Sequence, residues 1–246
     1  MLTTIARKIR TAGDLVEYIA YRKLRHAGGR IEIYKSLNRS WLLNRRFATI
    51  LDIGANRGQF ASSASYLIPD AQIYCFEPIP SCFRQLEVRF AGLPNVKCFN
   101  YGLGTDSSEL SFFENDFSPS SSFLATTSKQ TDAFPHTQVV KSVRVSVKQL
   151  DDVASDLNIV TPLFVKIDVQ GYELPVLLGG QKTIQQADVI QIETSFVELY
   201  EGQALFPEVY DLLTEWGFHY AGAMDQFADS STGEILQADS IFLSYR

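Results

Sequence analysis

The chain has 246 residues, 46% of them apolar, and a formal net charge of −6 at pH 7. This length and apolar content suit one large α/β domain with a buried core, and they exclude a disordered chain. Residues 47–246 carry 25 acids against 11 lysines and arginines. Nucleic acid is therefore not expected as the main partner, because phosphate binding requires a basic face.

The first 46 residues have the opposite balance, with 11 lysines and arginines against three acids. Spaced apolar residues predict a helix over residues 3–26 and a second over residues 37–45. We expect a basic helical arm at 1–46 and the main domain at 47–246. The arm could contact an anionic membrane surface or a partner enzyme, or could cover the sheet edge; its thin apolar face favours the last.

The cysteine spacing and the hydropathy indicate the compartment. Cys75, Cys82 and Cys98 show no C-x-x-C pattern, so neither a zinc site nor a disulfide framework is indicated. No stretch resembles the apolar core of a signal peptide or reaches the length of a transmembrane helix. The sequence therefore predicts a soluble protein of the reducing cytoplasm.

Residues 48–78 contain the most informative pattern of the chain. A buried strand is predicted over residues 48–53, followed by a glycine turn, a helix from Gln59 and a second strand over residues 73–76 that ends at Glu77. Strand, glycine turn, helix, strand and acid form a mononucleotide-binding half unit. We therefore expect a nucleoside ligand here.

The spacing of the glycines and the nearby acids indicate which nucleoside. The turn from Gly54 to Gly58 lacks the third glycine of a dinucleotide fingerprint, and Asp52 and Glu77 flank it. A pyrophosphate would require donors there, whereas a cationic ligand without phosphate suits the acids. S-adenosylmethionine carries a sulfonium, an ammonium and a ribose diol, and we predict that Glu77 binds the diol.

Further strands and helices follow in alternation. Helices are predicted at residues 81–90, 148–157, from Glu173 and at 207–216. Strands are predicted at residues 96–101, 110–113, 139–147, 162–168, 189–193, 218–224 and 240–245. This order predicts a Rossmann-like doubly wound sheet with a late β-hairpin.

Acids end four of the predicted parallel strands. Asp52, Glu77, Asp168 and Glu193 all fall at carboxyl ends, which meet at one edge of an open sheet where ligands bind. A Ser/Thr-rich loop over residues 115–136 separates two other strands. Its three serines, Ser120 to Ser122, could bind a polar substrate or could be solvated linker.

With these residues in view, the chain resembles the FkbM family of S-adenosylmethionine-dependent methyltransferases over residues 48–245. The residues that carry the resemblance are LDIGANRGQF (51–60), CFEPIP (75–80), FVKIDVQGYELPVLLGG (164–180), QIETSF (191–196), LYEGQ (199–203) and the ending TGEILQADSIFL. The resemblance implies a seven-stranded Rossmann-like fold and methyl transfer to a hydroxyl, often of a sugar or polyketide. Many members have Glu where this chain has Gln170.

We expect the cofactor to contact residues of these motifs and of the turn after the third strand. They are Asp52, Gly54, Ala55, Asn56, Gly58, Gln59, Phe60, Glu77, Pro78, Gly102 and Asp168. Asp168 and Glu193 are candidate bases for the hydroxyl proton, and Lys166 could keep Asp168 ionised. Asp168 could instead hold the cofactor's ammonium, and Glu193 could be a structural acid. His136 is a further candidate base.

The leading hypothesis is an O-methyltransferase that acts on a small-molecule or glycan acceptor, without a metal site. One alternative is a metal-assisted enzyme in which Asp168 and Glu193 bind Mg²⁺. A second alternative is a nucleoside-binding module without turnover. An NAD-dependent oxidoreductase is disfavoured by the missing glycine and the acidic site.

Overall fold

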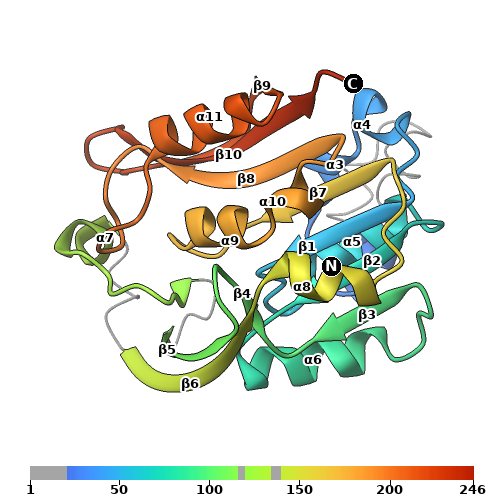
Figure 1. Cartoon of the computed structure of the whole chain (residues 1–246), viewed down its shortest axis with the longest axis horizontal. Helices are drawn as coiled ribbons and strands as arrows, with labels where there is room; N and C mark the ends of the chain where they lie inside the picture. Colours follow the sequence, from blue (N-terminus) through green and yellow to red (C-terminus); the bar gives the residue numbers. More distant parts are fainter. Residues whose placement is uncertain (1–20, 116–119, 134–139) are drawn as a thin grey trace, which may run out of the picture.

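The computed structural model describes residues 21–115, 120–133 and 140–246. These residues form a seven-stranded sheet with helices on both faces and a separate three-stranded sheet beside it (Figure 1). The predicted α/β class is confirmed.

The large sheet has the strand order β3-β2-β1-β7-β8-β10-β9. Five neighbouring strands run parallel: β3 (Val96–Phe99), β2 (Gln72–Phe76), β1 (Thr49–Ile53), β7 (Leu163–Ile167) and β8 (Val189–Ser195). β10 (Ile235–Ser244) runs antiparallel to β8, and β9 (Phe218–Ala228) pairs antiparallel with β10. The late hairpin is thus confirmed, with strands longer than predicted.

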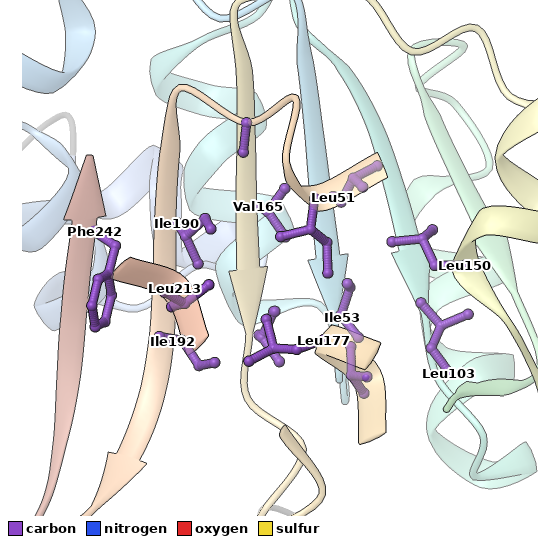
Figure 2. Close-up of a cluster of buried hydrophobic side chains, with 14 of the residues drawn as sticks. Leu51, Ile53, Leu103, Leu150, Val165, Leu177, Ile190, Ile192, Leu213 and Phe242 are labelled. Atoms are coloured by element: carbon purple, nitrogen blue, oxygen red, sulfur yellow. The ribbon is translucent and has the colours of Figure 1, made fainter. Parts of the chain in front are cut away.

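Helices cover both faces because alternate residues of the buried parallel strands point to opposite sides. Figure 2 shows one face, where Leu51, Val165 and Ile190 form a core with Leu177 and Leu213. The helices on this side are α8 (Leu150–Val153), the 3₁₀ turn η3 (Ala154–Asp156), α9 (Glu173–Gly179), α10 (Gln181–Ile184) and α11 (Phe206–Glu215). The helix predicted over residues 148–157 is therefore two short pieces.

The other face carries a second core cluster that includes Ile50, Ile73 and Phe164. It is covered by α5 (Gln59–Leu67), α6 (Pro80–Phe90) and two short helices of the arm. These are α3 (Ile31–Leu37) and α4 (Ser40–Leu43). The helix predicted over residues 37–45 is present as the shorter α4, whereas α3 was not predicted; the chain breaks at Asn38 and Arg39 between them.

Part of the arm is buried in the core. Residues 21–26 are helical, and the rest of the helix predicted over 3–26 lies outside the described residues. Leu37 and Leu42 are fully buried in the same cluster as Ile50. The described part of the arm therefore packs on the sheet, as the edge-covering interpretation anticipates.

The three-stranded sheet was not anticipated as a separate unit. β6 (Val140–Lys148) pairs in parallel with β4 (Gly102–Leu103) and antiparallel with β5 (Ser108–Asn115). The short helix α7 (Ser128–Ala133) lies in the connection between β5 and β6. This sheet stands beside the carboxyl edge of the large sheet, where it can wall a cleft.

Candidate functional site

A cavity of about 450 Å³ opens at the carboxyl ends of the parallel strands. It lies where the sheet reverses its winding, because α5 follows β1 onto one face and α9 follows β7 onto the other. Eleven of the residues predicted for the site line this cleft. They are Gly54, Ala55, Asn56, Gln59, Phe60, Glu77, Pro78, Gly102, Lys166, Asp168 and Glu193.

Two predicted cofactor contacts do not line the cleft. Asp52 is 0% exposed and lies beneath the floor. Gly58, at φ 81°, precedes α5, and a Cβ there would come within 2.8 Å of Leu86 and Phe90 of α6. Asp52 contacts Lys166, which does line the cleft, and Gly58 allows α5 and α6 to pack closely, so cofactor contact by these two residues stays a prediction.

Gly54 is required by the meeting of β1 and β7. Its φ is +78°, and a Cβ would lie 1.9 Å from the carbonyl oxygen of Asp168. Its own N–H donates to the Phe76 carbonyl at 3.1 Å, and the Asp168 N–H donates to the Ile53 carbonyl at 3.1 Å. The turn after β1 is thus held against the ends of both neighbouring strands.

The Lys166 ammonium lies between two acids, Asp52 of β1 and Asp168 directly after β7. Its Nζ lies 3.4 Å from Asp52 Oδ1 and 3.4 Å from Asp168 Oδ2, and it donates to the Gly54 carbonyl at 3.2 Å. Burial opposes the charged ammonium, but Asp168, Asp52 and Asp239 outweigh that effect and raise the lysine pKa. Asp168 therefore faces the cleft as a paired carboxylate with a 36% exposed side chain.

Glu77, directly after β2, holds the turn that follows β1 through its side chain. Its Oε2 accepts the Asn56 N–H at 2.7 Å, and its Oε1 accepts the Ile79 N–H at 2.8 Å. Burial raises the pKa of Glu77 to about 7 despite these hydrogen bonds. Each carboxylate oxygen can still accept a further hydrogen bond, so the geometry allows a pair of ligand hydroxyls to bind.

Gln170 connects the remaining two acids of the site. Its amide nitrogen donates to Asp168 Oδ1 and to Glu193 Oε2, each at 2.8 Å. Its amide oxygen accepts from the Tyr200 hydroxyl at 2.7 Å. Gln237 of β10 donates a second hydrogen bond to Glu193 Oε2 at 3.0 Å. Where many family members have Glu, this chain therefore has an uncharged amide that donates to two carboxyl groups.

Glu193 lies in an environment that disfavours its charge. Burial, followed by the nearby charges of Asp168, Glu173 and Asp239, raises its pKa well above the usual value. Its two donors in the described part of the chain are neutral amides, and both bind Oε2. Its Oε1 is left as the oxygen available to a ligand.

The serines of the long loop are buried rather than solvated. Ser121 Oγ accepts the Asn115 N–H at 2.9 Å, and Ser122 donates to the Gln170 carbonyl at 2.6 Å. Ser120 and Ser121 line the cleft. The solvated-linker interpretation is therefore wrong for these three residues. His136 lies outside the described residues.

Sequence reasoning missed Gln191 of β8 and the side chains that β9, β10 and α3 bring to the cleft. Gln191, Gln237 and Asp239 line it, as do residues on α3 and β9. The alternation of Gln237 and Asp239 within an apolar strand was the available signal. Nothing in the sequence indicated that α3 would reach the same cavity.

Among the described residues, no three His, Cys, Asp or Glu side chains are grouped so that they could hold a metal ion. No helix of residues 21–115, 120–133 or 140–246 is long and apolar enough to cross a membrane.

The strand order and the acid-lined cleft agree with the family comparison, which makes this chain an S-adenosylmethionine-dependent methyltransferase with a Rossmann-like fold. The chain belongs to the FkbM family of these enzymes, because the family model described as "Methyltransferase FkbM domain" matches residues 52–220, more than half of the chain. The family resemblance predicted from the motifs is confirmed, and with it the cofactor.

Individual relatives support the assignment. The 2-O-methyltransferase NoeI of Sinorhizobium fredii is 27% identical over 206 residues, which cover 79% of this chain and 81% of NoeI. The hexuronic acid methyltransferase AglP of Haloferax volcanii is 26% identical over 143 residues, or 58% of this chain and 54% of AglP. The crystal structure of an FkbM methyltransferase from Methylobacillus flagellatus shares the fold with a TM-score of 0.51 and 13% identity, covering 87% of this chain and 48% of that one.

The cleft fits the cofactor of this family. Asp168 presents an exposed carboxylate for a cation, and Glu77 presents oxygens for a diol. Ile79, Leu103 and Phe123 add an apolar wall on which a base can pack. These residues would hold S-adenosylmethionine, which supplies an electrophilic methyl group when bound.

Proposed function

We propose that this methyltransferase methylates a hydroxyl of a sugar or of a similar polyhydroxylated acceptor. The names of NoeI and AglP, which specify transfer to oxygen and a hexuronic acid for those proteins, support this class of acceptor. The carboxylate and amide side chains that line the cleft beyond Asp168 also suit hydroxyl donors.

The observation that carries the chemical proposal is the unequal environment of two neighbouring acids. Methyl transfer forms an O–C bond while an S–C bond breaks, and the hydroxyl proton must pass to a base. Lys166 pairs with Asp168, whereas Glu193 receives neutral amides and its pKa is raised. An acid whose environment disfavours charge accepts a proton more readily, so we assign Glu193 as the base.

Asp168 then has the other role that the sequence left open. Its carboxylate is held by Lys166 at Oδ2 and by Gln170 at Oδ1. Lys166 and Gln170 hold the carboxylate in place while its side chain stays 36% exposed and lines the cleft, which suits a group that binds a ligand cation. We assign Asp168 to holding the cationic amino-acid end of the cofactor.

The function is tested by incubating the full chain with S-adenosylmethionine and a panel of methyl glycosides. The expected result is a product heavier by one methylene, together with S-adenosylhomocysteine, and unchanged activity in the presence of a chelator. Loss of activity with chelator would favour the metal-assisted alternative. Metabolite extracts from cells with and without the protein, compared by mass spectrometry, extend the panel of acceptors. Tight cofactor binding without a methylated product from any acceptor would favour the nucleoside-binding module without turnover.

The two acid roles predict different variant behaviour. Glu193→Gln keeps the shape of the side chain but cannot take the proton, so single-turnover methyl transfer should fall by roughly 10² to 10⁴ with little change in cofactor affinity. Asp168→Asn should weaken cofactor binding more than it lowers the single-turnover rate of methyl transfer. Both are measured by calorimetry and rapid quench on the same preparations. The reverse pattern would make Asp168 the base.

A further inference from the structure

Two elements that lie far apart in the sequence, α3 and the β9–β10 hairpin, supply one part of the cleft lining. Arg30, Glu32, Ile33 and Ser36 reach it from α3 and the residue before it. Asp225 and Phe227 of β9 and Asp239 of β10 reach it from the late hairpin. Ile33 of α3 and Met224 of β9 both pack against the same large core cluster.

Negative charge dominates this part of the cleft. Glu32, Asp225 and Asp239 line the cleft with Glu193, with which Asp239 pairs across β10 and β8, and Arg30 is the one arginine among the described residues that line it. Lys166 is engaged by Asp52 and Asp168. Burial and then Asp168, with a further contribution from Asp225, raise the pKa of Asp239 to about 6. A further anion bound here would meet the same repulsion.

Two other side chains suit an uncharged ring with hydroxyls. Phe227 lines the cleft and is 44% exposed, so it offers an aromatic face on which the C–H groups of a sugar ring can pack. Gln191 lines the cleft and is 7% exposed, and its Oε1 is buried without a hydrogen-bond partner among the described residues. A buried acceptor without a partner is costly unless a ligand donor satisfies it.

Resting on the methyltransferase function proposed above, we propose that α3 and the β9–β10 hairpin form the acceptor subsite. It takes a neutral pyranose, whose ring packs on Phe227 and whose hydroxyls donate to Asp225, Asp239 and Gln191. It rejects sugars that carry a carboxylate next to the reacting hydroxyl. The expected acceptor therefore differs from the hexuronic acid that the name of AglP specifies for that protein.

The test compares methyl glucoside with methyl glucuronide, which differ in the neutral or anionic group at carbon 6. Binding to the full chain with S-adenosylhomocysteine is followed by ligand-observed NMR at about pH 8, where Asp239 is ionised. We expect the dissociation constant of the glucoside to be lower than that of the glucuronide by roughly tenfold or more.

Variants with matched controls locate the subsite. Phe227→Ala should weaken glucoside binding by roughly tenfold, whereas Gln226→Ala on the same strand, outside the cleft, should not. Asp225→Asn should narrow the difference between the two sugars. Asp211→Asn on α11 changes the net charge equally, lies outside the cleft, and should leave that difference unchanged.

Several results would overturn the subsite. They are tighter binding of the glucuronide, a preference that Asp225→Asn leaves intact, and binding of neither sugar. Preferred methylation of the glucuronide would overturn the subsite and leave the methyltransferase function standing. Glucoside binding that requires Phe227 but gives no methyl transfer would support the subsite and count against the proposed function.

Discussion

Gln170 is the residue on which the two acid roles depend. It has a left-handed backbone with φ 56°, and its carbonyl accepts from Ser122 while its side chain bonds to Asp168, Glu193 and Tyr200. A neutral amide satisfies two carboxyls at once without adding charge. A glutamate at this position would bring a third carboxyl to the same cluster.

Gln170→Glu should therefore move the acidic limb of the pH–rate profile to higher pH. The added acid removes two donors and, where ionised, raises the pKa of Glu193 further, so more of the base is protonated at a given pH. Single-turnover rates measured across the pH range check this. Gln85→Glu, exposed on α6, is the control and should leave the profile unchanged. An unshifted profile in Gln170→Glu would remove this residue from the base's environment.

Glu77 gives a second prediction at the scale of one residue. Glu77→Gln replaces one acceptor oxygen by an NH₂ group, which cannot accept a hydrogen bond from a backbone N–H or from a ligand diol. Cofactor binding should weaken by about 1.5 to 3 kcal/mol, as for a hydrogen bond to a charged group. Calorimetry with S-adenosylhomocysteine measures this, and Glu87→Gln on the exposed side of α6 is the matched control. Equal affinities for both variants would place the ribose elsewhere.

At the scale of one element, an acid at the start of α9 makes the free energy of unfolding depend on pH. Glu173 Oε1 accepts the N–H groups of Val169 at 3.1 Å and Gly171 at 3.2 Å. Burial raises the pKa of this acid from its usual 4.5 to about 7. The folded state therefore holds this proton at pH values where the unfolded state has released it. Folding stability must fall as pH rises through that window.

Glu173→Gln keeps an oxygen for both N–H groups but removes the titration. Between about pH 5 and pH 8 the wild-type chain should lose stability, and the variant should lose about 2 to 3 kcal/mol less. Urea unfolding at both pH values measures the difference. Glu215→Gln, exposed on α11, should behave as the wild type. Equal pH dependence in Glu173→Gln would mean that Glu173 ionises normally in the fold.

At the scale of the whole molecule, the basic arm and the sheet share one core. Leu42 of α4 is fully buried, whereas its neighbour Trp41 is 42% exposed. Leu42→Ala should lower the free energy of unfolding by about 2 to 5 kcal/mol, because it leaves a cavity in that core. Trp41→Ala should cost much less. A single unfolding transition with this ranking would show that residues 1–46 and 47–246 unfold together; a small cost for Leu42→Ala would show an independent arm.

Local signals were sufficient for much of the fold. Short apolar runs ended by Asp52, Glu77, Asp168 and Glu193 predicted the parallel strands and their shared edge, because burial on both faces demands such runs and parallel strands end together. Gly54 was predicted for the turn, and its positive φ agrees with that prediction. The sequence thus determined the class of fold and most of the cofactor half of the cleft.

The other half depends on which segments become neighbours. The insertion of β10 between β8 and β9 brings Gln237 and Asp239 beside Glu193, and the packing of α3 on α5 brings the arm to the same cavity. Depth depends on the pairing register: Asp52 pairs with Cys75 and Lys166, two residues before Glu77 and Asp168, so it lies deeper than those two acids and against Lys166. Spacing along a strand specifies the face on which a residue lies, whereas the layer above it comes from distant parts of the chain.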